Sequence, residues 1–194
     1  MSDSAFTNHF VYSQNVIEFV TVAAETCLLL EKLPETDKET FVDNFLKILP
    51  LLYLKTTLLK SPESVFDDEP MRFVTEDDYN EIKENIERLL GPDDSYLEVF
   101  HPDMPYSDTP VAAFISEDLA DIYQELKDFA ANYQTADIDV MNDALTVCLN
   151  AFSEHWGRKL LNALKALHSI RYASNVDKDD LQDMDYTQGK NRKS

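Results

Sequence analysis

The chain has 194 residues, of which 37 are acidic and 17 basic, so its formal net charge is −20 and its pI is about 4.3. A surface this negative repels phosphate backbones, because proteins bind nucleic acids largely through Lys and Arg, and it also opposes binding to anionic membrane surfaces. With 44% hydrophobic residues, the chain can bury a core of its own and needs no metal or disulfide to hold it.

Motifs that indicate common enzyme classes are missing from the sequence. Only three glycines occur, which argues against most phosphate-cradling loops, since those need clustered glycines. The N-terminal stretch MSDSAFTNHF has no basic segment followed by an apolar one, so no secretory signal is expected. Cys27 and Cys148 lie in apolar helical patterns and are expected to be buried, reduced thiols. We therefore expect a cytoplasmic protein without a membrane-spanning segment.

The first two predicted helices follow from apolar residues at helical spacing. The first spans residues 8–32 and ends before Pro34. Thr36 and Glu39 have the spacing of a capping box, which would open the second helix. Pro50 lies inside that second helix and predicts a kink or a break, because its ring clashes with a preceding carbonyl and it has no N–H to donate.

A third helix and a long connection come next. Residues 60–74 form an acidic linker, Thr75 is expected to cap the third helix, and Gly91 to end it. The connection over residues 92–109 is longer than most loops of compact domains, and such loops often carry function. Its aromatic side chains either pack it onto the bundle or make it a lid or a partner surface: Tyr96, Phe100, His101 and Tyr106.

The fourth and fifth predicted helices complete the chain. Asp108 or Thr109 as N-cap and Pro110 at the first helical position predict a fourth helix over residues 111–134. The fifth covers residues 138–172 and can bend at Gly157. The sequence thus predicts an all-α, single-domain bundle of about five helices over residues 1–173, followed by a disordered polar tail over residues 174–194.

Three carboxylates stand out on the fourth helix. At about 100° per residue, Asp118, Asp121 and Glu125 fall within roughly 60° of one another beside the apolar stripe, with Asp118 nearest the core and Asp121 furthest outward. Three oxygen ligands at this spacing could hold Mg²⁺ or Mn²⁺ if a second helix supplied more. The plainer interpretation is that they form the solvated flank of an amphipathic helix in an acidic protein.

The fifth helix offers the facing surface. Trp156 belongs to its core stripe, whereas His155 and His168 lie on opposite flanks, roughly 140° apart, and cannot meet on one ion. Cys148 shares the flank of His155 in this arithmetic, about 10 Å away along the axis. Residues 158–171 contain four cations and no acid. We expect Asp121 or Glu125 to pair with these cations across the bundle; an anionic ligand or an acidic partner segment is the alternative.

The stretches SEDLADIYQELKDF (116–129) and HWGRKLLNALKALHSI (155–170) resemble a bacterial family of domains of unknown function, whose members are short, acidic and helical. The N-terminal VIEFVTVAAE (16–25) is similar as well, so the resemblance covers residues from about 10 to 172. It implies an all-α, single-domain fold and no particular activity. Six positions match the pattern of this family: Asp118, Asp121, Tyr123, Trp156, Gly157 and His168.

Two functions stay open on the sequence, and whether the protein is an enzyme is not decided. The first is a non-enzymatic interaction or regulatory protein without a cofactor, which binds a protein partner or a second copy. It would use the groove between the 111–134 and 138–172 helices or the 92–109 connection. The second is a hydrolase of a phosphate compound that binds Mg²⁺ or Mn²⁺ through Asp118, Asp121 and Glu125. The candidate binding residues of the first are Asp118, Asp121, Tyr123, Glu125, His155, Trp156 and His168.

Overall fold

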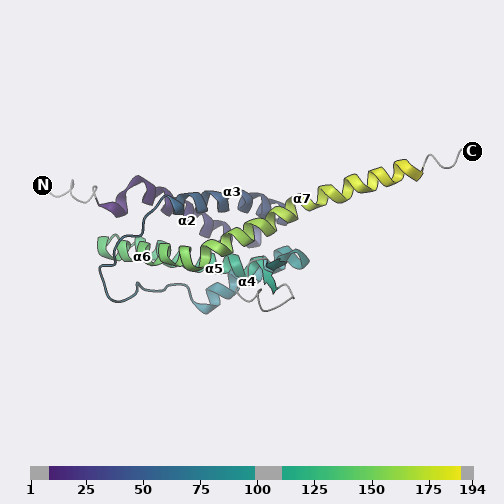
Figure 1. Ribbon diagram of the computed structural model, residues 1–194. Coiled ribbons are helices and arrows are strands. Elements are labelled where there is room, and N and C mark those ends of the chain that lie inside the picture. Colours follow the sequence, from purple (N-terminus) through teal and green to yellow (C-terminus); the bar gives the residue numbers. More distant parts are fainter. Residues whose placement is uncertain (1–8, 99–110, 189–194) are drawn as a thin grey trace, which may run out of the picture.

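The computed structural model describes residues 9–98 and 111–188, and within this part the side chains as far as residue 173. Most of it is helical, and helices from both halves of the chain run lengthwise along an elongated bundle (Figure 1), so the all-α prediction is confirmed. The α-helices are α2 (Gln14–Glu31), α3 (Lys38–Thr57), α4 (Glu76–Leu90), α5 (Ile115–Tyr133), α6 (Ile138–Ala151) and α7 (Gly157–Gln188). Short 3-10 turns separate some of them: η1 (Phe10–Tyr12), η2 (Leu33–Glu35) and η3 (Gly91–Asp94).

Helix α5 lies at the centre of the bundle and packs against α2, α4, α6 and α7. Its predicted apolar stripe is confirmed, because Leu119, Ile122 and Leu126 are fully buried. The ring of Phe129 lies 5.2 Å from that of Phe19 in α2, measured between centroids. Since each fully buried Leu or Ile contributes about 1.5–3 kcal/mol, this stripe fixes the position of α5 against its neighbours.

A two-stranded hairpin precedes α5, where the sequence predicts a helix. Strand β1 (Ser95–Glu98) pairs antiparallel with β2 (Val111–Phe114), and Leu97 lies opposite Ala112. Helix α5 therefore begins at Ile115 and not after Pro110, so that boundary was wrong. Strands of four residues are too short to show alternation in a sequence, and they become stable only by packing on other elements. The remaining aromatic and capping residues expected between positions 99 and 110 lie outside the described residues.

Two local predictions in the first half also need correction. The N-cap of α3 is Asp37, whose carboxylate accepts from the backbone N–H of Thr40 at 3.0 Å, so the Thr36–Glu39 capping box was wrong by one residue. Pro50 lies inside α3, so the predicted break is absent, while the alternative of a kink stays a prediction. The capping of α4 by Thr75 is confirmed, with Asp78 as the reciprocal partner.

The predicted fifth helix consists of two helices joined by a π-helical turn. This turn, η5 (Phe152–Trp156), lies between α6 and α7 and ends at Gly157. A Cβ atom on Gly157 would lie 2.5 Å from the carbonyl oxygen of Phe152 and 2.9 Å from its ring, so only glycine fits without a shift. The ring of Phe152 packs between Tyr53 and Trp156, with centroid distances of 5.3 and 4.7 Å. Irregular turns of this kind are frequent at functional sites.

The C-terminal segment leaves the bundle. Helix α7 continues as far as Gln188, through the polar segment from residue 174, and this half of the helix projects away from the other helices (Figure 1). The disorder that the sequence predicts for this segment stays a prediction. In the part of the chain that the structure describes, no helix combines the length and the apolar character needed to cross a membrane.

Both cysteines are buried and unpaired, as expected. Burial raises the pKa of the Cys27 thiol to about 12, and it also raises the pKa of Cys148 well above its usual value. Neither thiol is therefore a nucleophile in the folded protein, because the reactive species is the thiolate.

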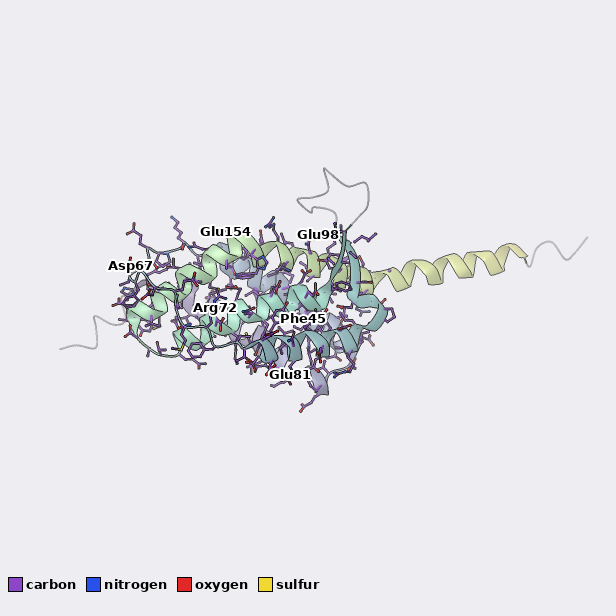
Figure 2. The ribbon with its side chains drawn as sticks, turned by 90° about the horizontal axis from the view of Figure 1, so that it is seen from below. Phe45, Asp67, Arg72, Glu81, Glu98 and Glu154 are labelled. Carbon is purple, nitrogen blue, oxygen red and sulfur yellow. The ribbon has the colours of Figure 1, made fainter. Side chains whose placement is uncertain are left out.

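The acidic linker between α3 and α4, residues 60–74, contains no helix or strand and runs over α5 and α6. We call it the strap. Figure 2 shows Asp67 of the strap at one end of the bundle and Glu98 of the hairpin towards the other. Two non-helical segments are thus attached to the helical bundle at separate places.

Candidate functional site: a polar cluster beneath the hairpin

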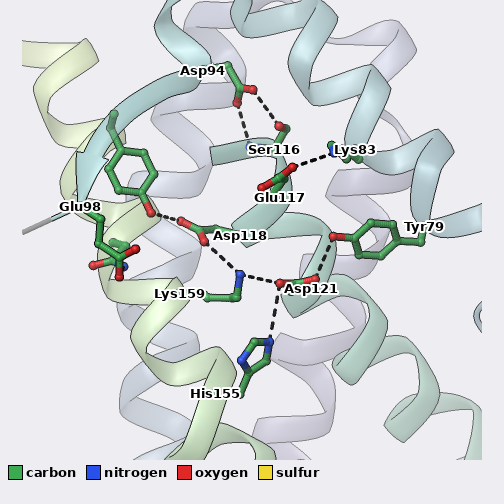
Figure 3. Close-up of polar contacts among 12 residues, drawn as sticks. Tyr79, Lys83, Asp94, Glu98, Ser116, Glu117, Asp118, Asp121, His155 and Lys159 are labelled. Atoms are coloured by element: carbon green, nitrogen blue, oxygen red, sulfur yellow. Dashed lines mark hydrogen bonds and ion pairs between the residues drawn. The ribbon is translucent and has the colours of Figure 1, made fainter. Parts of the chain in front are cut away.

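Polar side chains from four elements meet beneath the hairpin, and we call them the polar cluster (Figure 3). The ammonium of Lys159 lies 2.6 Å from Oδ2 of Asp121 and 3.5 Å from Oδ1 of Asp118. Each carboxylate also accepts a hydrogen bond from a tyrosine hydroxyl: Tyr79 donates to Asp121 at 2.9 Å, and Tyr96 donates to Asp118. The members come from α4 (Tyr79), β1 (Tyr96), α5 (Asp118 and Asp121) and α7 (Lys159).

Helix geometry explains why these groups share a face. Asp118 and Asp121 are three residues apart on α5, and residues at this spacing are neighbours on a helix surface. His155 and Lys159 are four residues apart across the end of the π turn. Nε2 of His155 lies 3.6 Å from Oδ2 of Asp121, at the edge of the cluster, and half of its side chain is exposed. The π turn and the start of α7 thus bring two basic groups to the same acid.

The electrostatics of the cluster are dominated by burial. Asp118 is only 4% exposed. Burial raises the pKa of its carboxyl to about 6, although the hydrogen bond from Tyr96 and the charge of Lys159 act in the opposite direction. For Lys159, burial lowers the pKa, but the hydrogen bond and charge of Asp121, together with Asp118, outweigh it and raise the pKa. The lysine therefore stays charged, whereas the pKa of Asp118 is raised to about 6.

Both tyrosines remain protonated donors. Burial and the adjacent carboxylates raise the pKa of Tyr79 and of Tyr96 far above the usual value. Their hydroxyl protons are held by carboxylate acceptors, and hydrogen bonds to a charged acceptor are stronger than neutral ones. The cluster is therefore a closed network in which the acids, the hydroxyls and the ammonium bind one another.

A second group of contacts fixes the hairpin and the start of α5. Asp94, which ends η3, accepts from the backbone N–H of Ser116 at 2.8 Å and from its hydroxyl at 2.7 Å. Asp94 thus supplies the cap that Phe114, at the N-cap position, cannot provide. In β1, Glu98 accepts from the amide of Asn162 at 3.2 Å. The hairpin is consequently tied to α5 and α7 on both sides of Tyr96.

The structure brings together some of the predicted residues. Asp118, Asp121 and His155 meet in the cluster, and Asp118 is the more buried of the two acids, as expected. The pairing of Asp121 with the cations of residues 158–171 is confirmed through Lys159. That pair is only about a quarter exposed, however, so it is not the solvated contact that the sequence predicts.

The other predicted residues lie elsewhere. Tyr123 donates to Glu31 of α2 at 3.0 Å, and Trp156 is fully buried, with its indole N–H on the carbonyl of Cys148 at 3.0 Å. His168 is exposed and packs against the ring of Tyr172, with a centroid distance of 4.6 Å and a tilt of 44° between the rings. These residues are parts of the core or the outer surface and not of the cluster.

The three carboxylates do not converge on one ion. Glu125 lines a small pocket between α5 and the strap together with Arg72, while Asp118 and Asp121 bind Lys159. Burial raises the pKa of Glu125, and Arg72 partly offsets this. Among the residues that the structure describes, no group of three or more His, Cys, Asp or Glu side chains could hold a metal ion. The metal-dependent alternative gains no support from this geometry.

Sequence reasoning missed the roles of Tyr79, Tyr96 and Asp94. Tyr79 and Tyr96 lie 42 and 22 residues from the carboxylates that accept from them, and Asp94 lies 22 residues from its donor Ser116. No local pattern indicates such contacts. The only available signal was the position of Tyr96 in a long connection rich in aromatic residues.

The fold and the cluster define a small all-α bundle domain with a hairpin anchored at one end. A family described as a domain of unknown function (DUF5063) matches residues 10–173, and the chain belongs to this family, as the resemblance indicated. The structure is similar to the crystal structure of protein BF1032 from Bacteroides fragilis, a structural genomics target. The two share 43% sequence identity with a TM-score of 0.76, over 84% of this chain and 96% of that chain. No curated protein matches the chain.

Proposed function

We propose that the protein is a non-enzymatic, cytoplasmic interaction protein, which binds a protein partner through the outer face of its hairpin. The supporting observation is the exposure of Leu97, 63%, and of Phe114, 40%, on the side of the hairpin that faces away from the cluster. Together with the exposed Ala112 they form what we call the hairpin face. Exposed apolar patches with a polar rim are typical of protein interaction sites.

The polar cluster supports this proposal because it makes the hairpin face rigid. Side chains alternate along a strand, so Tyr96 and Glu98 point to the bundle when Leu97 points away from it. Tyr96 is bonded to Asp118, and Glu98 to Asn162. A surface that is fixed before binding loses less conformational entropy when a partner arrives. The cluster then has a positioning role, and its hydrogen-bonded groups need not react.

The chemistry of the partner follows from charge. A chain with a net charge of −20 attracts basic surfaces and repels nucleic acids. The partner is therefore a protein with an apolar contact surface and basic residues around it. The two unpaired, buried cysteines fit a reducing compartment such as the cytoplasm.

A crosslinking experiment tests the proposal. A photoreactive amino acid is placed at Leu97, at Ala112 or, as a control, at Leu28, which is 44% exposed on α2. We expect the same protein to be crosslinked in cells from positions 97 and 112 but not from position 28. Binding of that purified partner should weaken at least about tenfold in Leu97→Asp and stay unchanged in Leu28→Asp. Equal crosslinking from all three positions, or unaltered binding by Leu97→Asp, would refute the proposal.

A further inference from the structure

Helix α3 carries an exposed apolar stripe that nothing in the described structure covers. Leu51, Leu54 and Leu58 are 39%, 53% and 51% exposed. Leu58 is the C-cap residue of α3 and keeps a helical conformation, so at positions i, i+3 and i+7 the three lie on one side of the helix. We call these three residues the leucine stripe. It lies on a different element from the hairpin face, so it is independent of the proposed function.

The leucine stripe lies in a stretch of the chain that contains no acidic residue. Residues 44–62 contain no Asp or Glu, although the whole chain has 37, and they contain Lys47, Lys55 and Lys60. Lys55 is bound to Glu18 of α2 at 2.6 Å. Lys47 and Lys60 are exposed at either end of the stripe. The stripe thus suits a segment that combines apolar and acidic side chains.

The strap has this composition. Between residues 61 and 71 it contains four acids and no base. Four of its large apolar side chains are exposed, in fractions between 43% and 68%. Together with the leucine stripe, they account for seven of the 14 large apolar side chains that are exposed in the described part of the chain. The strap residues concerned are Val65, Phe66, Met71 and Phe73, with the acids Glu63, Asp67, Asp68 and Glu69.

The strap is fixed through its backbone, which leaves its side chains free for a partner. Asp143 of α6 accepts from the N–H groups of Val65 and Phe66, each at 2.7 Å. Asp128 of α5 accepts from the N–H groups of Phe73 and Val74, at 2.6 and 2.9 Å. Because the helices bind main-chain groups, the strap is held in place while its apolar side chains face solvent.

Two amides complete this attachment. Asn142 donates to the carbonyl of Glu63, and Asn132 donates to that of Met71, both at 2.7 Å. Asn142, Asn132 and Asp143 are each less than 7% exposed. Buried polar side chains that hold a loop by its backbone give a surface of fixed shape, which lowers the entropy cost of binding.

We infer that the leucine stripe of one copy of this chain binds the strap of a second copy. The two surfaces match in apolar character and are opposite in local charge. They are also adjacent, because the strap begins three residues after α3 ends at Thr57. If a two-fold axis relates the two copies, the stripe of each copy contacts the strap of the other. These two equivalent contacts give a closed dimer.

Sedimentation of the full chain tests the inference. We expect a dimer at concentrations on the order of 10 µM. Leu54→Asp and Phe66→Asp should each raise the dissociation constant at least about tenfold, while Leu28→Asp, an exposed leucine outside both surfaces, should not. Circular dichroism checks that each variant is folded, and Leu54→Ser and Phe66→Ser replace any variant that is not.

Mixing the two variants identifies which surfaces meet. A copy with Leu54→Asp keeps its strap, and a copy with Phe66→Asp keeps its stripe, so the mixture retains one of the two contacts. We expect the mixture to associate more tightly than either variant alone. A monomeric wild type at about 100 µM would overturn the inference. So would a dimer sensitive to Leu54→Asp but not to Phe66→Asp, since two stripes would then bind each other.

Discussion

The hairpin and the strap are attached to the helical bundle by different kinds of contact. Each is a non-helical segment held on the bundle by a buried carboxylate, Asp118 for the hairpin and Asp143 for the strap. Asp118 accepts from the side-chain hydroxyl of Tyr96 and faces the ammonium of Lys159. Asp143 accepts from two backbone N–H groups. The hairpin attachment therefore depends on particular side chains, whereas the strap attachment depends on the path of the main chain.

The two carboxylates also differ in charge state. Burial raises the pKa of Asp118 to about 6. Burial acts on Asp143 in the same direction, but the N–H groups of Val65 and Phe66, with the amide of Asn142, outweigh it and hold the pKa below its usual value. The hydrogen bonds that a carboxylate accepts thus oppose the effect of burial on its pKa, and they prevail at Asp143 but not at Asp118. This contrast can be tested by removing each attachment in turn.

The largest effect is expected from Asp143→Ala. The substitution removes two part-buried hydrogen bonds from the N–H groups of Val65 and Phe66 to a carboxylate, and each hydrogen bond to a charged group is worth about 1.5–3 kcal/mol. The free energy of unfolding should fall by about 3–5 kcal/mol, measured by urea denaturation. Asp139→Ala, an exposed acid on the same helix, should cost less than about 1 kcal/mol. Equal losses in the two variants would show that the strap is not held through Asp143.

Asp118 should make stability depend on pH. Because its pKa rises from 3.8 to about 6 on folding, the folded protein binds a proton that the unfolded chain has lost between these values. Its contribution to stability therefore falls as the pH rises from about 4 to about 6, by on the order of 3 kcal/mol, and stays low above that range. Asp118→Asn removes this loss, so the variant should gain stability relative to wild type as the pH rises. Urea denaturation across this range measures the difference, and a constant difference would contradict the prediction.

Asp143 should behave in the opposite sense, which provides the control. Its folded-state pKa is depressed below 3.8, so its contribution is complete above that value and is lost as the pH falls through the folded-state pKa. The stability difference between wild type and Asp143→Asn should therefore not change between about pH 5 and pH 8.

Gly157→Ala tests the π turn that brings His155 and Lys159 to the hairpin side of the bundle. The added methyl group would meet the carbonyl and the ring of Phe152 at 2.5 and 2.9 Å. Overpacking of this kind costs about 1–3 kcal/mol, and we expect about 2 kcal/mol by thermal denaturation. Ser153→Ala, in the same turn but exposed, should change stability by less than about 0.5 kcal/mol. A neutral Gly157→Ala would mean that the turn can shift at no cost.

The smallest effect is expected from Tyr96→Phe. The variant loses one hydrogen bond to Asp118, which corresponds to about 1.5 kcal/mol, the lower end of the range for a bond to a charged group. Amide hydrogen exchange should become faster in β1 and β2 and stay unchanged in the strap. Tyr79→Phe removes the equivalent bond to Asp121 and should leave the hairpin amides as they are. Faster exchange in the strap of Tyr96→Phe would show that the two attachments are coupled.

Much of the helical fold could be predicted because its signal is local. The apolar stripe of α5 repeats over several turns, and Leu119, Ile122 and Leu126 all lie in the core as expected. The residues at which helices begin and end were harder to predict. Asp37 and Thr36 are adjacent residues of the same capping type, and nothing in the sequence distinguishes them. The stretch Val111–Phe114 became a strand because β1 is beside it, and pairing of that kind is not visible locally.

The candidate site could be predicted only where one helix determines it. Asp118 and Asp121 share a face of α5, and the sequence also indicated a cation on the opposing helix. Placing residues at about 100° each around a regular α-helix failed at the π turn, where the helix is not regular. That placement puts Cys148 and His155 on the same flank, but Cys148 is buried and the side chain of His155 is 52% exposed.

The two buried cysteines allow local opening of the protein to be measured by thiol labelling. Cys148 lines the pocket under the strap, and Cys27 lies in α2 in the same core. A thiol reagent reaches either sulfur only when the surrounding structure opens. The labelling rates of Cys148 and Cys27 therefore report how often the strap lifts and how often α2 separates, in one unmodified protein.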